Sequence, residues 1–539
     1  MSLELSCDVL VLGGGPAACW AAWSAASAGA RVIVADKGYL GASGSAAASG
    51  NGVLAVPPDE RAAVIAQRSD VGRGLVDTLW LERMLETTWR SLPLIEEWGY
   101  AFPKQDGKPV RNSYYGPEYL RVLRKRLLRS GVQILDQSPA LELLVSEDGA
   151  VAGARGLRRQ AHTYYEVRAG AVVLATGGCA FLSKALGSNV NTGDAFLMAV
   201  EAGAELSGME FSSQYGISSA LNATATRGVP YAWATFYDAQ GHSLGGFMEN
   251  RREDWFLPKA LLQGPVYAKL DRATAEVRAV IEKSHFIAFL PLRKAGIDPY
   301  TQLFPVTLVL AGTVRGAGGV RIVTDDCGAT IPGLYAAGDA ATRELIAGAA
   351  TGGGGPNAAW AISSGQWAGA GAAKFARGLG PQANTRSVKP AGRVGLDGRE
   401  HAAGCFDSDV IIGAVQAEMF PLEKNYYRNE PGLTRSLVQL DAAWSELQRQ
   451  PNVENTREIE RSRTAAFLTA SARWAYRASL RRRETRSLNR RTDFPQTDPA
   501  QCHYQATGGL DEIWTRSEPV RSLQPTAATQ AHARVHEAR

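Results

Sequence analysis

A glycine-rich turn near the N-terminus constrains the fold more than any other feature of this sequence. The mostly apolar run at residues 7–12 leads directly into Gly13-Gly14-Gly15-Pro16. Residues 17–30 are rich in alanine and suit a helix lying close on a sheet, and residues 31–35 have the composition of a second buried strand. The order strand, helix, strand predicts a Rossmann-like nucleotide-binding unit.

The turn matches the fingerprint of dinucleotide-binding proteins, Gly13-x-Gly15-x-x-Ala18, with Asp36 ending the second strand. Gly13 permits the turn, Gly15 leaves room for a pyrophosphate, and Ala18 lets helix and strand pack closely. The helix N-terminus would face the phosphates, and Asp36 would accept hydrogen bonds from a ribose. A ligand-free tight turn has the same glycines, but the strand context and the spacing to Asp36 favour a cofactor site. The predicted cofactor residues here are Gly13, Gly15, Pro16, Ala17, Ala18, Asp36 and Lys37.

Two later segments repeat the pattern of a strand running into glycine, at residues 170–178 and 333–339. The sequence therefore predicts an α/β fold with a discontinuous Rossmann-like domain, an inserted α+β capping domain and a C-terminal helical domain. The expected boundaries are 1–210 and 310–377 for the nucleotide-binding domain, 211–309 for the cap, 378–407 for a linker, 408–495 for the helical domain and 496–539 for a tail. The basic clusters at 481–483 and 490–491 are typical of a solvated helix face.

Composition excludes several classes of protein. The 539 residues carry 58 basic and 53 acidic side chains, an excess too small to indicate nucleic-acid binding. The six cysteines are scattered, which predicts neither a disulfide framework nor a metal site, and so no iron–sulfur cluster in the chain. No stretch of about 18 apolar residues is free of charge, so we expect a cytoplasmic protein without a membrane span.

The later motifs carry a family resemblance. Thr176-Gly177-Gly178, Asn191-Thr192-Gly193-Asp194 and the segment 331–339 resemble the succinate dehydrogenase and fumarate reductase flavoprotein family, which includes L-aspartate oxidase and the adenylylsulfate reductase flavoprotein subunit. The segments 483–487 and 493–495 are similar to the family's C-terminal signature. The resemblance implies FAD as cofactor, a loop at residues 43–52 beside the isoalloxazine ring, and a helix after Gly355 pointing at the flavin. The further cofactor residues it implies are Ser43, Gly44, Ser45, Ser49, Gly50, Asn51, Ala175, Thr176, Gly177, Asn191, Thr192, Asp194, Gly338, Asp339, Gly355, Pro356 and Asn357.

The sequence departs from the family at the positions that bind FAD covalently and that hold a dicarboxylate. Gly44 and Ser45 stand where succinate dehydrogenases carry a flavin-linked histidine, so FAD is expected to be non-covalent. Residues 211–215 replace an HPT-type motif, residues 314–319 lack the later histidine, and Thr351 replaces a carboxylate-binding arginine. A succinate or fumarate carboxylate would lose its bidentate partners here.

Two arginines are the candidate catalytic residues. Arg252 is the nearest match to the family's proton-donating arginine, and Arg315 would supply positive charge near the flavin. Each is equally consistent with a solvated surface arginine. His285, within the insert, is the histidine we would test, although a lone histidine among aromatic residues is more often structural.

The expected function is that of an FAD-dependent dehydrogenase or reductase which transfers hydride between a small organic substrate and flavin N5. Electrons would pass to oxygen, to a diffusible acceptor or to a separate iron–sulfur or ferredoxin-like subunit, in a homo- or hetero-oligomer. Two alternatives stay open: an aspartate-oxidase-like oxidase of an amino acid or amine, and a non-catalytic flavoprotein scaffold.

Overall fold

The computed structural model describes residues 2–42, 44–48, 50–221, 228–247, 255–396, 407–449 and 456–520. Its main sheet has the order β19-β8-β9-β10-β1-β2-β7, with β18 paired to β10. Strands β1, β2, β7, β10 and β18 run parallel, and β8, β9 and β19 extend one side in antiparallel fashion. Their bounds are β1 (Leu3–Leu12), β2 (Val32–Ala35), β7 (Gln133–Leu135), β8 (Ala140–Ser146), β9 (Val151–Arg158), β10 (Thr163–Leu174), β18 (Leu334–Ala336) and β19 (Val388–Pro390).

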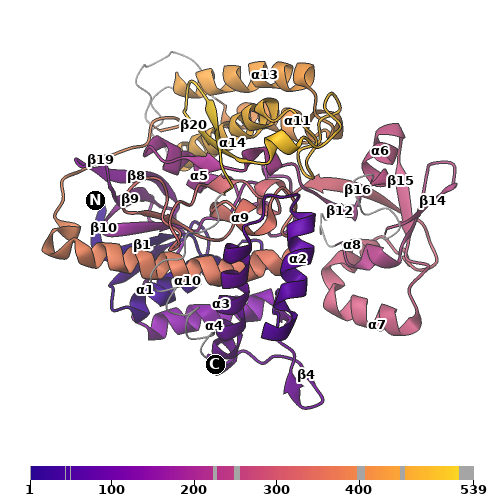
Figure 1. Cartoon of the computed structure of the whole chain (residues 1–539), viewed down its shortest axis with the longest axis horizontal. Helices are drawn as coiled ribbons and strands as arrows, with labels where there is room; N and C mark the ends of the chain where they lie inside the picture. The colour runs from indigo at the N-terminus through magenta and orange to yellow at the C-terminus, as the bar shows by residue number, and fades with distance from the viewer. Residues whose placement is uncertain are drawn as a thin grey trace.

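Helices α1 (Pro16–Ser27) and α10 (Gly354–Gly378) pack against each other along the sheet (Figure 1). Small residues make this contact possible. A Cβ on Gly369 would lie 2.1 Å from the carbonyl oxygen of Ala21, and one on Gly365 would lie 2.6 Å from that of Ala17. The alanine-rich sequence after the glycine turn therefore serves close helix packing, and α1 is held with its N-terminus at the end of β1.

The insert is a compact unit at one side of the molecule (Figure 1). Its five-stranded sheet has the order β12-β16-β15-β13-β14, and it has a hydrophobic core separate from that of the main sheet. The strands are β12 (Tyr215–Ser219), β13 (Thr235–Tyr237), β14 (Ser243–Gly246), β15 (Val266–Lys269) and β16 (Phe304–Leu310), and the helices are α6 (Phe256–Gln263), α7 (Ala275–Ser284) and α8 (Phe286–Lys294).

The C-terminal region is helical, as expected, with α11 (Ser408–Met419), α12 (Leu422–Asn425), α13 (Glu430–Gln448) and α14 (Thr456–Arg481). The remaining elements are α2 (Arg61–Val71), α3 (Thr78–Glu97), α4 (Gly116–Arg129), α5 (Asp194–Glu201), α9 (Glu344–Ala347), β3 (Gly50–Gly52), β4 (Lys104–Gln105), β5 (Lys108–Pro109), β6 (Ser113–Tyr115), β11 (Leu206–Ser207), β17 (Gly319–Val320), β20 (Tyr504–Gly508) and β21 (Trp514–Glu518). The parallel core and the helical C-terminal region confirm the predicted fold class.

Two segments are more ordered than the sequence suggested. Within the expected linker, β19 pairs with β8 at the edge of the main sheet, where Pro390 is tolerated. Within the expected tail, β20 and β21 join β11 and β17 in a four-stranded sheet. These strands are short and their partners lie far away in sequence, so no local sequence pattern predicts them.

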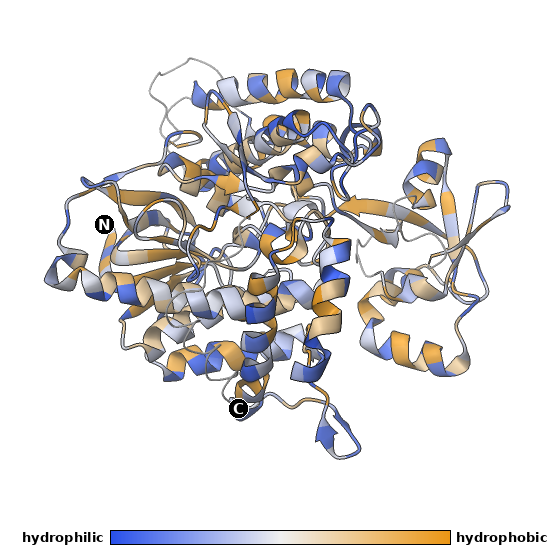
Figure 2. Ribbon diagram, in the orientation of Figure 1, coloured by the Kyte–Doolittle hydropathy of each residue, from blue (hydrophilic) through white to orange (hydrophobic). Residues whose placement is uncertain are grey.

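The prediction of a solvated basic helix face is wrong for several arginines. Of the arginines in the two clusters, Arg482 and Arg491 are completely or almost completely buried, because acidic side chains and backbone carbonyls accept hydrogen bonds from their guanidinium groups. Figure 2 shows the apolar strands of the main sheet and, by contrast, the hydrophilic hairpin at β4. In the described part of the chain, no helix is both long and apolar enough to cross a membrane.

Candidate functional site

A cavity of about 1130 Å³ opens at the carboxyl ends of β1, β2, β10 and β18. In sheets of this kind ligands bind beyond the carboxyl ends of the strands. The cavity runs from the glycine turn to a far wall formed by Arg315, Asp339 and the beginning of α10. A cavity of this volume, lined by the glycine turn as well as by Arg315 and the beginning of α10, suits a dinucleotide rather than a small ligand.

Each glycine of the turn is favoured at its position for a different steric reason. Gly13 has φ +118°, and a Cβ there would lie 2.2 Å from the carbonyl oxygen of Ala175. A Cβ on Gly14 would lie 2.4 Å from Asp36 Oδ2. By contrast, a Cβ on Gly15 would meet nothing within 4 Å, and Gly15 faces the cavity. The absence of a side chain at Gly15 thus leaves space for a ligand group in the cavity.

The N-terminus of α1 provides an anion site at this turn. Pro16 occupies the start of the helix, and Gly15 offers no side chain to cap the first backbone N–H groups. Uncapped N–H groups and the positive end of the helix dipole stabilise a phosphate. The pyrophosphate of FAD fits these residues, because it requires both the open space beside Gly15 and these donors.

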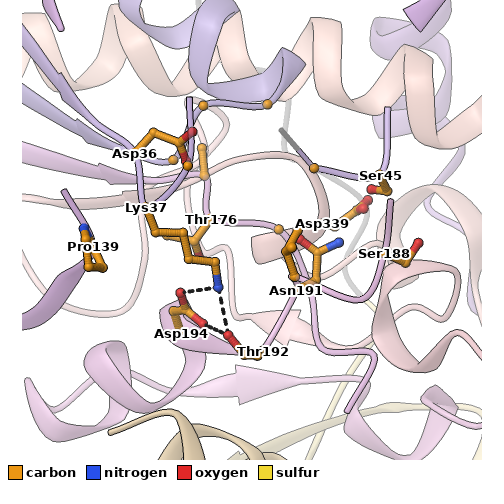
Figure 3. A pocket seen from close by; sticks show the side chains of 18 of the residues that line it. Asp36, Lys37, Ser45, Pro139, Thr176, Ser188, Asn191, Thr192, Asp194 and Asp339 are labelled. Carbon is orange, nitrogen blue, oxygen red and sulfur yellow. Dashed lines mark hydrogen bonds and ion pairs between the residues drawn. The ribbon is translucent and has the colours of Figure 1, made fainter. Parts of the chain in front are cut away.

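Lys37 and Asp194 form an ion pair on the wall of the cavity (Figure 3). Lys37 Nζ lies 2.9 Å from Asp194 Oδ2 and donates to Thr192 Oγ1 at 2.8 Å. Asp36, by contrast, points toward the glycine turn, and it is only 6% exposed. The two neighbouring residues at the end of β2 therefore have different partners, and Lys37 joins β2 to the start of α5.

The far wall contains an unpaired acceptor and an unpaired donor. Asn357 Nδ2 donates to the carbonyl oxygen of Val314 at 3.1 Å, whereas Asn357 Oδ1 is buried without a hydrogen-bond partner. Asn191 Nδ2 is also buried and unpaired. Such atoms are rare in folded proteins unless a ligand or water satisfies them. A flavin ring fits, since it carries N–H, ring-nitrogen and carbonyl groups.

Asp339 and Arg343 connect this wall to the interior. Arg343 is fully buried and donates to Asp339 Oδ1, to the carbonyl oxygen of Gly316 at 3.1 Å and to that of Thr313. Burial raises the pKa of Asp339, while the charges of Arg343 and Arg315 oppose the rise. Burial likewise lowers the pKa of Arg315, and the charge of Asp339 opposes that change. Positive charge is thus concentrated where the cavity ends.

The start of α10 also faces the cavity. Gly353, with φ +66°, precedes the helix, and a Cβ on Gly353 or Gly354 would meet nothing within 4 Å. The helix begins at Gly354, so Pro356 is not its first residue. A helix N-terminus here stabilises negative charge by about 0.3 to 2 kcal/mol.

The side chains at the positions where the family binds a substrate carboxylate form hydrogen bonds within the protein. Ser212 Oγ donates to the carbonyl oxygen of Met209 at 2.6 Å, and Ser213 Oγ donates to that of Leu488. Thr351 Oγ1 donates to the carbonyl oxygen of Arg315 at 2.7 Å. These hydroxyls do not replace the missing histidine and arginine as carboxylate ligands.

The structure places most of the expected site residues around one cavity. Those that line it are Gly13, Gly15, Pro16, Ala17, Asp36, Lys37, Gly44, Ser45, Asn51, Ala175, Thr176, Gly177, Asn191, Thr192, Asp194, Gly338, Asp339, Asn357 and Arg315. Ala18, Gly50, Gly355 and Pro356 are not among the residues that line it. Ser43, Ser49 and Arg252 fall outside the described residues, and His285 immediately precedes α8 in the insert as its N-cap.

One part of the cavity wall was not predicted from the sequence. It is formed by the C-terminal helices. Residues of α11 and α14, including Asp409, Arg457, Glu460 and Arg461, line the cavity. Arg159 links them to the nucleotide-binding domain, because it pairs with Glu460 and also donates to the carbonyl oxygen of Lys37. No local motif marks these residues.

The fold and the cavity define a flavoprotein with a dinucleotide site. Residues 8–356 match the family described as FAD binding domain. The chain belongs to this family and is an FAD-dependent oxidoreductase of the fumarate reductase and succinate dehydrogenase flavoprotein type.

Three comparisons illustrate the relationship. The chain is 27% identical to the fumarate reductase flavoprotein subunit of Mycobacterium tuberculosis, over 91% of this chain and 92% of that protein. It is 28% identical to the L-aspartate oxidase of Streptomyces coelicolor, over 62% of this chain and 63% of that protein. The structure of adenylylsulfate reductase from Archaeoglobus fulgidus superposes with a TM-score of 0.77 at 18% identity, over 97% of each chain. The three relatives named by the sequence motifs are thus all found.

Proposed function

We propose that the chain catalyses hydride transfer between a carbon atom of a small organic substrate and N5 of non-covalently bound FAD. One observation carries this proposal: a single cavity joins the phosphate-binding turn to a wall that bears Arg315, Asp339 and the start of α10. FAD, when bound, supplies the two-electron chemistry. The residues of the chain bind the cofactor, orient the substrate and hold charge.

The insert lies close to the loop proposed to contact the flavin ring. The carbonyl oxygen of Ser284, at the end of α7, lies 3.8 Å from the position that a Cβ on Gly50 would take. This proximity supports a substrate site between the insert and the flavin, from which closure of the insert excludes water. Arg315 would stabilise negative charge on the substrate, and Arg252 would donate a proton.

The internal hydrogen bonds of Ser212, Ser213 and Thr351 argue for a substrate other than a free dicarboxylate. Buried carboxylates require paired or bidentate partners. Arg315 lines the cavity and its charge interacts with that of Asp339, and its guanidinium suits one anionic group. We infer a substrate with at most one carboxylate, or with a neutral carbonyl or alkene as its reacting group.

A separate electron-transfer subunit, iron–sulfur or ferredoxin-like, is part of this proposal. The relative from M. tuberculosis is named as a subunit, which supports an assembly of more than one chain. Electrons added to the flavin by substrate need an acceptor before the next turnover. Reoxidation of the reduced protein by a ferredoxin-like protein, faster than by air, would support such a partner.

The first experiment is a visible spectrum of the purified protein, followed by acid precipitation. Free FAD in the supernatant would support the non-covalent site, and an anaerobic screen of monocarboxylates, alkenes and ketones for flavin reduction or oxidation would then test the reaction. A colourless protein that cannot be reconstituted with FAD would overturn the proposal. So would a flavoprotein that exchanges hydride only with succinate or fumarate, because the substrate class would be wrong.

The similarity to L-aspartate oxidase supports a second candidate, an oxidase of an amino acid or amine. Such an enzyme would return electrons to oxygen and need no protein acceptor. Rapid reoxidation of the reduced flavin in air, with hydrogen peroxide as product, would favour it. If the reduced flavin stays reduced in air, this candidate is lost.

A further inference from the structure

Four unpartnered polar atoms lie in the interior around the pairing of β11 with β20. Oε2 of Glu210, Oε2 of Glu344, Oγ1 of Thr507 and Nδ1 of His503 are all buried without a hydrogen-bond partner. The pairing of β11 with β20 brings their segments together, since Leu206 lies opposite Thr507. Buried polar atoms are nearly always satisfied, so four unsatisfied ones in one region require a proton or water between them.

The two glutamates are the centre of this group. Glu344 Oε1 accepts a hydrogen bond from Ser207 Oγ, and Glu210 Oε1 accepts one from Arg482 Nε at 2.8 Å. Glu210 is 0% exposed and Glu344 is 2% exposed. Gly208 leaves room beside them, because a Cβ there would lie 3.0 Å from Glu344 Oε2. Two carboxyl groups thus share a buried region, each with one oxygen available.

Charge around the pair favours one bound proton. Arg482 is shared between Glu210 and Glu484, and its other N–H groups donate to the carbonyl oxygens of Gln501 and His503. The groups that face Glu344 from neighbouring elements are Glu210, Arg482, Arg321 and Tyr504. Arg321 is engaged by Glu205 and Glu518, and Arg343, the residue before Glu344, reaches Asp339 instead.

Among the described residues, then, no guanidinium is hydrogen-bonded to Glu344. Burial, reinforced by the charge of Glu210, raises the pKa of Glu344 to about 8.

We propose that Glu344, beside the ion-paired Glu210, is a proton-exchange site that responds to the charge on the flavin. Glu344 follows Arg343, whose partner Asp339 lines the cavity. A reduced, negatively charged flavin in the cavity would favour protonation of Glu344. The proton comes from solvent through His503, whose Nε2 lies 2.9 Å from the exposed Ser517 Oγ. No covalent bond to carbon or flavin changes in this step.

The test is the pH dependence of the flavin midpoint potential, measured in the FAD-loaded protein between about pH 6 and about pH 10. In the wild-type protein the potential should fall more steeply with pH above about pH 8, the value for Glu344, because one additional proton accompanies each two electrons. Glu344→Gln keeps the side-chain volume but cannot exchange a proton, so its potential should not fall more steeply above about pH 8. Glu210→Gln removes a neighbouring negative charge and should move the change of slope to lower pH.

Glu418→Gln is the matched control. Glu418 is also buried, but both its oxygens are bonded, one to Ser436 at 2.5 Å and the other to Lys424 at 2.8 Å. This variant should behave as wild type. A wild-type protein without a change of slope, or a Glu344→Gln protein that retains it, would overturn the proposal.

Infrared difference spectra cover the case in which Glu344→Gln fails to fold. In the wild-type protein above about pH 8, reduction should strengthen the carbonyl band of a protonated carboxyl group. Absence of that band change would also overturn the proposal. The reductant is dithionite and no substrate is added, so the outcome depends only on FAD binding and not on the proposed reaction.

Discussion

Arg463 of α14 and Glu201 at the end of α5 form an ion pair in which both side chains are completely buried. Arg463 also donates to the carbonyl oxygens of Leu141 and Val394, and Glu201 Oε1 accepts from the backbone N–H groups of Arg393 and Val394. One pair therefore joins the helical region to the main sheet and to the segment after β19. The cavity wall formed by α14 depends on this joint.

Removing one partner of that pair should destabilise the protein strongly. Glu201→Gln or Arg463→Met leaves a buried charge without its counterion, which typically costs about 3 to 5 kcal/mol. Denaturant unfolding followed by circular dichroism measures the loss. Asp409→Asn is the control, because the Asp409–Arg461 pair is exposed and such pairs contribute about 0 to 1 kcal/mol. Equal effects of the buried and exposed changes would contradict the assignment.

Gly14 and Gly15 should respond differently to alanine, although they are adjacent. Gly15→Ala adds a methyl group to open cavity space, so the apoprotein should fold normally while FAD affinity falls by about tenfold or more, or about 1.4 kcal/mol. Gly14→Ala places its Cβ against Asp36 and should lower the stability of the apoprotein itself. Thermal unfolding of the apoprotein and FAD titration separate the two effects. Normal FAD binding by Gly15→Ala would show that the pyrophosphate lies elsewhere.

Arg315→Gln should impair the reaction more than cofactor binding. Its guanidinium lies at the end of the cavity, and loss of one group that stabilises developing charge typically slows catalysis by about 100-fold to 1000-fold. Single-turnover flavin reduction by substrate, with FAD content measured on the same sample, gives the result. Arg377→Gln is the control, because Arg377 is exposed and donates to the carbonyl oxygen of Ala28 away from the cavity. Equal rates for Arg315→Gln and wild type would remove Arg315 from the site.

Arg252→Ala tests the remaining candidate catalytic residue. If Arg252 donates a proton, its loss should leave FAD bound and slow substrate-dependent flavin reduction by about 100-fold or more. A steeper loss at high pH than at low pH would follow, since solvent protons can partly substitute at low pH. An unchanged rate would refute the role and leave Arg315 as the candidate catalytic arginine.

The phosphate-binding end of the site could be predicted from sequence because each of its constraints is local. Gly13, Gly15 and Asp36 act through their own backbone or immediate neighbours, so their spacing carries the information. The family motifs extended the prediction to Thr176, Asn191 and Asp339 in the same cavity.

Long-range contacts could not be predicted in this way. Arg482 belongs to a run of arginines typical of a solvated surface, yet it is buried because Glu210, which is 272 residues earlier, receives its Nε–H. Likewise, β20 forms a strand because it pairs with β11, which lies about 300 residues earlier in the chain. Whether a basic run is buried, and whether a short segment forms a strand, depends on partners far away in the sequence. A single sequence does not identify these partners.

The raised pKa of Glu344 predicts a stability that decreases as pH rises. The carboxyl group has its ordinary value of 4.5 in the unfolded chain and about 8 in the folded protein, so between these values the folded state holds the extra proton. The free energy of unfolding should therefore fall with pH by about 1.4 kcal/mol per pH unit across this interval from this group alone, and the contribution should level off above about pH 8. Denaturant unfolding of wild type and Glu344→Gln at several pH values isolates the contribution of Glu344 to the free energy of unfolding, because the other titrating groups are common to both proteins. The difference in stability between the two should shift in favour of Glu344→Gln as pH rises, whereas Glu418→Gln should run parallel to wild type. A difference independent of pH would mean that Glu344 is ionised in the folded protein throughout the range.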